Sequence, residues 1–196
     1  QTPRQRVEAK QGRVKISLSR DSAPLEPLGT QVTDELASFV APTAFIQSDD
    51  PEIVAAAKQA VGDAKDVFTA TSRLTEFVYS AIRDEYVPAY SNAKEALESG
   101  RGDCTEHAIL FVALARALGI PAKVAVGVAY WPPGGGFGWH AWAEVNAGGE
   151  WFAVDPTWNQ PIADATHLKL AGGGPAEQAR IVMMLGQLEI EEMTGG

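Results

Sequence analysis

Cys104 is the residue with the clearest chemical potential, because it is the one cysteine of the sequence and stands where a helix is expected to begin. Asp103 before it suits an N-cap, and Glu106 follows at the spacing of a capping box. At the first helical position, free backbone N–H groups and the helix dipole favour negative charge, so we expect the pKa of the thiol to be lowered. The same N–H groups could hold the oxyanion of an acyl intermediate. The sequence therefore predicts a nucleophile and an oxyanion donor at one place.

A base and an orienting carboxylate are predicted by the hairpin that follows. The sequence favours strands at residues 139–146 and 150–154, and a four-residue loop between them places His140 opposite Asp155. Other loop lengths shift the pairing by one or two residues, which keeps the two side chains within reach. An aspartate beside a histidine fixes its tautomer and supports its protonated form. If the helix N-terminus packs on this edge, Cys104, His140 and Asp155 are nucleophile, base and orienting residue.

The elements that must position these side chains fall into two groups, helices first and strands afterwards. Periodicity and capping residues predict helices at 51–61, 64–83, 92–97 and 104–118. Alternation predicts strands at 13–19, 123–130, 139–146 and 150–154, with a loop at 131–138 and irregular chain at 157–175. Residues 1–12 look flexible, 32–40 fit a short strand or helix, and a last strand is expected around Leu188 and Ile190. This order is typical of an α+β fold in which the cysteine helix packs on an antiparallel sheet.

The chain is expected to form one core with a flanking segment at each end. A hydrophobic content of 45% suffices for one full core, which we place at residues 49–175. Residues 1–48 are interpreted as an arm or the end of a preceding β domain, and 176–196 as a C-terminal extension with a possible strand. The start at Gln1 and the basic leader favour an exported, extracytoplasmic or periplasmic protein that is part of a longer chain.

Charge and composition argue against several classes of protein. Residues 1–20 carry six basic residues and one acidic residue, whereas the other 176 carry ten basic and twenty-four acidic residues, which gives the net charge of −9. An acidic body argues against a nucleic-acid partner. No apolar run approaches the roughly 18 residues that a transmembrane segment needs. A single cysteine cannot form an intrachain disulfide, so the compartment stays open.

Three blocks of sequence resemble the transglutaminase-like superfamily, in its bacterial and archaeal branch. They are residues 102–108 around Cys104, residues 140–145 from His140, and residues 151–157 around Asp155. The resemblance covers about residues 50–170. It implies a papain-like α+β core with a Cys-His-Asp triad on these three residues. A protein or peptide substrate is expected, with no cofactor and no metal, because no calcium-ligand loop is visible.

The implied reaction is attack of the Cys104 thiolate on an amide carbonyl, after His140 takes the proton. The resulting thioester is resolved by water in a peptidase or amidase, or by an amine in a transglutaminase. The motif fixes the chemistry, whereas the acceptor depends on the groove. Competition by water makes hydrolysis the first choice. A second oxyanion donor has no predicted position.

Two other interpretations of the cysteine stay open. One is a non-catalytic module that binds a peptide or a cell-wall strand on the same fold, in which Cys104 would react slowly with alkylating agents. The weaker one is a metal site using Cys104 and His107. We favour a structural role for His107, a hydrogen bond behind the site. His167 is expected to be a surface or loop histidine, and Glu144 a solvated or salt-bridged strand residue.

All five tryptophans lie between residues 131 and 158. Trp142 and Trp151 are expected to pack in the core and against the sheet. Trp131, Phe137 and Trp139 flank the Gly-Pro loop next to the predicted base. They could line a substrate groove or form a lid, or they could simply pack against the sheet, and the sequence favours neither alternative.

Overall fold

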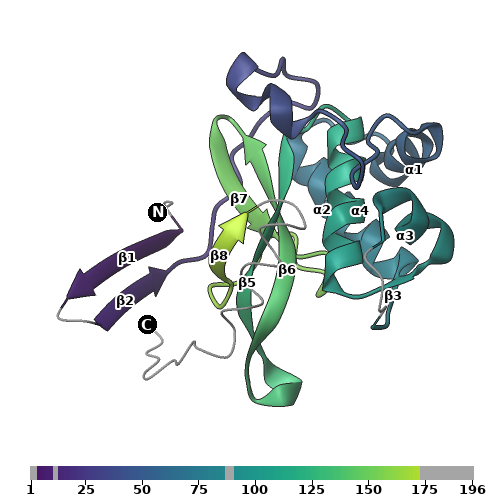
Figure 1. Ribbon diagram of the computed structural model, residues 1–196. Helices are drawn as coiled ribbons and strands as arrows, with labels where there is room; N and C mark the ends of the chain where they lie inside the picture. The colour runs from purple at the N-terminus through teal and green to yellow at the C-terminus, as the bar shows by residue number, and fades with distance from the viewer. Residues whose placement is uncertain (1–3, 11–12, 87–90, 173–196) are drawn as a thin grey trace.

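The computed structural model describes residues 4–10, 13–86 and 91–172 (Figure 1). The helices are η1 (Asp34–Phe39), α1 (Pro51–Val61), α2 (Val67–Ala81), α3 (Ala93–Ser99), α4 (Cys104–Ala117) and η2 (Pro132–Gly134), of which η1 and η2 are short 3-10 helices. The strands are β1 (Gln5–Lys10), β2 (Arg13–Leu18), β3 (Arg83–Asp84), β4 (Arg101–Gly102), β5 (Ala122–Trp131), β6 (Gly136–Ala147), β7 (Glu150–Val154) and β8 (Leu168–Gly172).

Helices cover one face of a four-stranded antiparallel sheet, whose strand order is β7-β6-β5-β8 (Figure 1). The helix α4 lies between the sheet and the other helices, and it contacts α1, α2, α3, β5 and β6. Every residue of α4 from Glu106 to Arg116 is therefore buried. This arrangement confirms the predicted α+β fold with the cysteine helix packed on an antiparallel sheet.

Capping residues fix the starts of the helices that lead to the site. Asp50 accepts the N–H of Glu52 at 2.8 Å, and α1 follows with Pro51 as its first residue, as predicted. The second helix was expected from residue 64, but Asp66 accepts the N–H of Thr69 at 2.8 Å and so starts α2 three residues later. A complete capping box at Asn92 starts α3.

The hairpin of β5 and β6 is longer than predicted. The expected loop at 131–138 is confined to residues 132–135, because strand pairing continues to Trp131 opposite Gly136. Tyr130 and Phe137 are cross-strand partners near the tip, with ring centroids 5.6 Å apart in an edge-to-face arrangement. Such aromatic pairs stabilise the pairing of two strands. The loop was predicted because the stretch is rich in glycine and proline.

Two strands were missed in stretches interpreted as irregular or flexible. β8 pairs with β5, and the register shifts between Val126 and Gly127. Its backbone comes so close that a Cβ on Gly127 would lie 2.0 Å from the carbonyl oxygen of Leu168. β1 pairs with β2, where polar side chains hide the alternation. The short segment left open at 32–40 contains η1, and the strand predicted around residues 188–190 lies outside the described residues.

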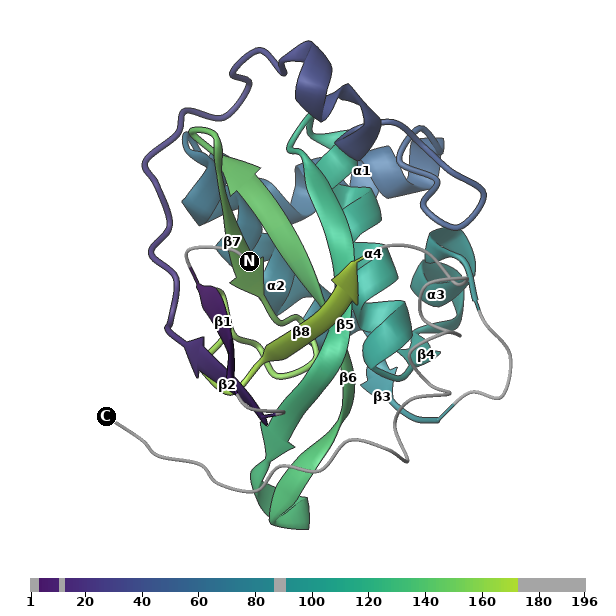
Figure 2. The same ribbon diagram turned by 60° about the vertical axis from the view of Figure 1, so that its left-hand side comes forward.

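The β1–β2 hairpin projects from the molecule, and the N-terminal arm touches the sheet at single points (Figure 1 and Figure 2). Gln5 exchanges two hydrogen bonds of 2.9 Å with the backbone of Lys169 in β8. Further along, Asp21 accepts the N–H of Ala153 in β7 at 2.9 Å. Helices that combine the length and the apolar character needed to cross a bilayer do not occur in the described ranges.

Candidate active site

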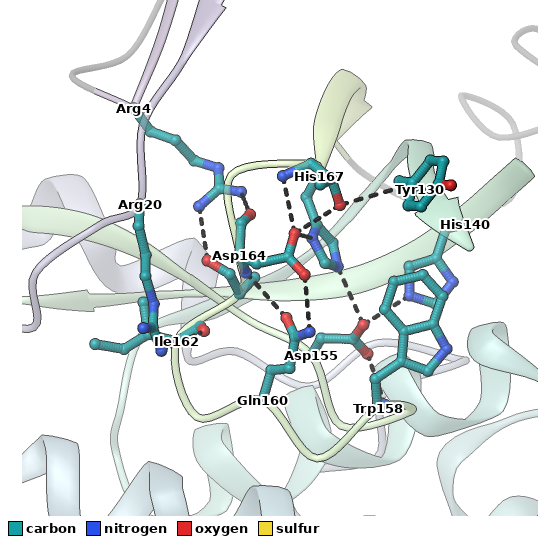
Figure 3. Close-up of polar contacts among 12 residues, drawn as sticks. Arg4, Arg20, Tyr130, His140, Asp155, Trp158, Gln160, Ile162, Asp164 and His167 are labelled. Atoms are coloured by element: carbon teal, nitrogen blue, oxygen red, sulfur yellow. Dashed lines mark hydrogen bonds and ion pairs between the residues drawn. The ribbon is translucent and has the colours of Figure 1, made fainter. Parts of the chain in front are cut away.

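His140 and Asp155 are joined by a hydrogen bond of 2.8 Å between Nε2 and Oδ2 (Figure 3). The register between their strands pairs Ala143 with Val154, so the turn is the two-residue Gly148–Gly149 and not the four-residue loop expected. Both glycines have positive φ, which favours this tight turn. His140 is therefore offset from Asp155 by two residues on the same face, and its side chain closes the gap.

The carboxylate of Asp155 is fully buried and accepts four hydrogen bonds. Its Oδ1 accepts the N–H groups of Thr157 at 2.8 Å and Trp158 at 3.3 Å. Its Oδ2 accepts His140 Nε2–H and His167 Nε2–H, the second at 3.1 Å. Burial alone would raise the pKa of Asp155, but the hydrogen bonds from the two histidines outweigh it and hold the pKa well below its usual range. Asp155 is therefore a fixed anion.

The imidazole of His140 is held in one orientation. Because an ionised carboxylate only accepts hydrogen bonds, Nε2 carries the proton toward Asp155 and Nδ1 has the free lone pair in the neutral ring. The indole of Trp158 stacks on the imidazole, with centroids 4.2 Å apart and an interplanar angle of 10°. Only 4% of His140 is exposed. Its Nδ1 is thus the nitrogen that can act as a base.

The thiol of Cys104 reaches the backbone beside His140. Asp103 and Glu106 form the predicted capping box and start α4 at Cys104. The sulfur accepts a hydrogen bond from the N–H of Ala141. This N–H is available because β7 ends opposite Ala143, and Pro156, which follows soon after, has no N–H with which to extend the ladder. The end of β7 therefore leaves the edge of β6 open for the thiol.

The lowered pKa expected for the Cys104 thiol is wrong. Burial of the sulfur raises its pKa to about 12, and the negative charges of Asp103 and Asp155 act in the same direction. Hydrogen bonds from the Ala141 N–H and the Thr105 hydroxyl oppose this increase and are outweighed. The cysteine at rest is a neutral thiol, which needs a base when it reacts.

His107 faces its own helix, as expected for a structural residue. It is buried, and its Nδ1 lies 2.7 Å from the carbonyl oxygen of Asp103. Among the described residues, the set whose ligand atoms lie close enough for a metal ion is His140, Asp155 and His167, and it does not include Cys104 or His107. In that set, Nε2 of His140 and Nε2 of His167 both lie within hydrogen-bond distance of Asp155 Oδ2, so hydrogen bonds account for the proximity of the three side chains.

His167 is the residue that the sequence interpretation misplaced. It was expected on the surface, but none of its side chain is exposed. The residues 156–167 fold back over the face of the sheet that bears His140, and they also supply Trp158 and Asp164. Nothing in local periodicity marks these residues, because they lie in irregular chain.

Strand alternation separates the three aromatic candidates. Phe137 and Trp139 share a face of β6 with Ala141, whose N–H binds the thiol. Trp131 stands opposite Gly136, so it lies on the other face at the tip of the hairpin, and it is 52% exposed. Trp142 is buried as expected, and Trp151 packs edge-to-face on Phe39 with centroids 5.0 Å apart. Glu144 is bound by Lys123 and Lys169, as expected for a salt-bridged residue.

Residues 54–156, just over half of the chain, match the transglutaminase-like superfamily, and the chain belongs to that superfamily. A crystal structure of a candidate cysteine protease from Cytophaga hutchinsonii is similar, with a TM-score of 0.65 and 26% identity over 76% of this chain and 50% of that one. The periplasmic domain of TgpA from Pseudomonas aeruginosa shares the fold, with a TM-score of 0.51 and 19% identity over 65% of this chain and 49% of that one. No match was found among curated proteins. This chain spans about half the length of each of the two similar structures.

Proposed function

We propose that the protein carries out thiol-dependent acyl transfer or hydrolysis of an amide in a protein or peptide. The observation that carries the proposal is the 2.8 Å bond between His140 Nε2 and Asp155 Oδ2. It leaves Nδ1 of His140 as the base, next to the Ala141 N–H that binds the thiol of Cys104. Nucleophile, base and orienting carboxylate are the parts of a Cys-His-Asp triad. Membership of the transglutaminase-like superfamily supports the same assignment.

In the first half of the proposed reaction, Nδ1 of His140 takes the thiol proton while the sulfur bonds to the amide carbonyl carbon. The oxyanion that forms lies at the start of α4, where the Cys104 N–H has no acceptor within the described part of the chain. When the carbonyl re-forms, the C–N bond breaks. The imidazolium of His140 then protonates the leaving amine, and a thioester remains on Cys104.

In the second half, His140 takes a proton from water or from an amine as that molecule attacks the thioester. The C–S bond breaks, and the thiol of Cys104 recovers the proton. Water gives a carboxylic acid, and an amine gives a new amide. We infer hydrolysis as the first activity, because water competes for any exposed thioester. Trp139 is the aromatic candidate best placed to contact substrate, because it shares a strand face with Ala141 and is partly exposed.

The test is incubation of the protein with a mixed peptide library, with and without a primary amine, followed by mass spectrometry of peptides and of intact protein. The wild type is expected to release cleaved or amine-modified peptides and to accumulate an acyl adduct on Cys104. Cys104→Ala removes both signals, and His140→Gln lowers turnover by about 100-fold or more. Turnover that survives Cys104→Ala would overturn the proposal.

The raised thiol pKa favours a second candidate function, a non-catalytic module that binds peptide or cell-wall strands. A neutral thiol without a working base behaves as an inert small side chain. Alkylation by iodoacetamide separates the two functions. In an enzyme, the rate at pH 7 depends on His140 and falls in His140→Gln. In a binding module, the substitution leaves a slow rate unchanged.

A further inference from the structure

His167 lies between two carboxylates, one on each nitrogen of its ring. Nε2 is 3.1 Å from Asp155 Oδ2, and Nδ1 is 3.1 Å from Asp164 Oδ1 (Figure 3). Because an ionised carboxylate only accepts, each of the two nitrogens must donate a proton. The geometry therefore requires a doubly protonated imidazolium. The ring has no exposed surface, so it cannot touch a substrate and can act only through its neighbours.

Asp164 is itself fixed by its neighbours. Its Oδ1 accepts the N–H of Thr166 at 2.8 Å and the hydroxyl of the same residue at 2.6 Å, and its Oδ2 accepts Gln160 Nε2–H at 2.9 Å. The hydrogen bond from His167, together with these, holds the pKa of Asp164 well below its usual range. Burial alone would lower the pKa of His167, but Asp155 and Asp164 outweigh it and raise the pKa.

We propose that His167 is a positioning residue, an imidazolium that links Asp164 to Asp155 and so holds the Asp155 carboxylate against the Nε2–H of His140. The inference rests on the proposed function, in which His140 is the base. It extends the predicted pair of His140 and Asp155 to a hydrogen-bonded chain of four, in the order His140, Asp155, His167, Asp164.

The chain of four would do two things for the base. First, His167 occupies the position on Oδ2 that would otherwise be a buried, unpaired lone pair, so the Asp155 carboxylate cannot rotate away from His140. Second, the positive charge of His167 offsets part of the negative charge of Asp155. Asp155 then orients His140 without binding the proton on His140 too strongly for its later transfer to the leaving amine.

The charges around His167 come from a small set of groups. Asp155 and Asp164 bind the ring, and the His140 ring lies 5.6 Å away between centroids. Arg4 binds the backbone carbonyl of Asp164 and not its carboxylate. The rings of Trp142 and Trp158 cover the remaining sides at 5.2 and 5.4 Å and exclude water.

Two substitutions separate positioning from a merely structural role. The amide of His167→Gln can still donate to Asp155 but carries no charge, whereas His167→Asn reaches only toward Asp164. The readout is the rate of iodoacetamide alkylation of Cys104 in the full chain, measured by intact mass from pH 4 to 10, which needs no substrate. His167→Gln is expected to keep the alkylation rate at neutral pH within about threefold of the wild-type rate. The acid limb of the profile, where the rate falls as the pH is lowered, is expected to move up by about one pH unit, because Asp155 then favours the protonated base more strongly. His167→Asn is expected to lower the rate at neutral pH by about tenfold.

His107→Asn is the matched control, because His107 is equally buried but lies outside the chain of four. It is expected to cost stability and to leave the acid limb unmoved. The inference is overturned if folded His167→Gln and His167→Asn both keep the wild-type profile. Failure of the proposed function looks different: His140→Gln would then leave the alkylation rate at pH 7 unchanged.

A measurement on the wild type keeps the inference testable if the variants do not fold. The chain has three histidines, so 15N-histidine NMR resolves each ring. His167 is expected to show two slowly exchanging N–H groups and the 15N shifts of an imidazolium at pH 7. A neutral His167 ring at that pH would rule out the link between the two carboxylates.

Discussion

At the scale of single residues, the reactivity of Cys104 is decided by opposing influences on its thiol. The start of α4 and the Ala141 N–H favour a thiolate, but burial and the charges of Asp103 and Asp155 raise the thiol pKa to about 12. A cysteine in this state reacts at neutral pH only when a base removes its proton in the reacting step. The proposed role of His140 follows from this need.

Removal of the base should expose the raised thiol pKa directly. In His140→Gln, the alkylation rate of Cys104 is expected to rise about tenfold for each pH unit through the alkaline range, because thiolate forms only as the pH approaches 12. The measurement is the iodoacetamide rate from pH 7 to 11. A short cysteine peptide is the control, and its rate levels off above a pKa of about 8.5. If His140→Gln levels off there too, the thiol is not stabilised in its neutral form.

At the scale of elements, the site depends on where the strand β7 ends and on how closely β8 approaches β5. β7 ends before it can cover the edge of β6 at Ala141, which leaves room for the thiol. β8 follows directly after His167 and packs its backbone against β5 at Gly127. The position of His167 therefore depends on the contact between β5 and β8.

Gly127→Ala tests this contact. Its Cβ would lie 2.0 Å from a backbone oxygen, which cannot move aside as a flexible side chain can. We expect a loss of about 1–3 kcal/mol in the free energy of unfolding and a lower alkylation rate of Cys104, because β8 and His167 are displaced together. Gly138→Ala is the matched control, since its Cβ would meet nothing within 4 Å.

Urea unfolding measures the first effect and intact mass the second. Gly138→Ala is expected to change stability by no more than about 0.5 kcal/mol. Equal stabilities of the two glycine variants would show that β8 does not need the close approach at Gly127.

At the scale of the whole molecule, the parts of the site come from opposite faces of the sheet. Ala141 packs into the core that the helices share with the sheet, whereas Trp142 belongs to a cluster on the other face. Alternation along β6 therefore turns His140 away from the helix that carries Cys104. The Ala141 N–H at the open edge of β6 faces the thiol and is adjacent in sequence to His140, and residues 156–167 close over the imidazole. The N-terminal arm holds these residues in place from outside.

Arg4 is a buried anchor of the arm. Its guanidinium binds Asp21 at 3.2 Å, the carbonyl of Ala163 at 3.1 Å and the carbonyl of Asp164. Arg4→Ala is expected to lower the free energy of unfolding by about 3 kcal/mol, because it leaves buried acceptors and part of a buried ion pair without a partner. Denaturant unfolding of the full chain measures this effect.

Arg20 offers a matched control on the same arm, since it also binds a carbonyl of the loop, that of Ile162 at 3.3 Å, but in an exposed position. Arg20→Ala removes the same charge and is expected to cost no more than about 0.5 kcal/mol. Similar losses for the two arginines would mean that net charge, and not the buried contacts of Arg4, secures the arm.

The sequence by itself determined the starts of α1 and α4, the order in which the main helices precede β5, β6 and β7, and the three residues proposed as the triad. These features follow from local rules, because a capping box, a proline at the end of a strand and strand alternation act over a few neighbouring residues. The capping box at Cys104 and the strand from Glu150 to Val154 were predictable for that reason.

The tertiary structure alone decided the strand β8, the raised thiol pKa and the burial of His167. Each depends on contacts between segments far apart in the chain. Desolvation and the electrostatic field of distant charges set a pKa, and neither is visible in the spacing of residues. His167 is the clearest case: its neighbours in sequence suggest a loop on the surface, and only the folding of that loop over β6 makes it the partner of Asp155.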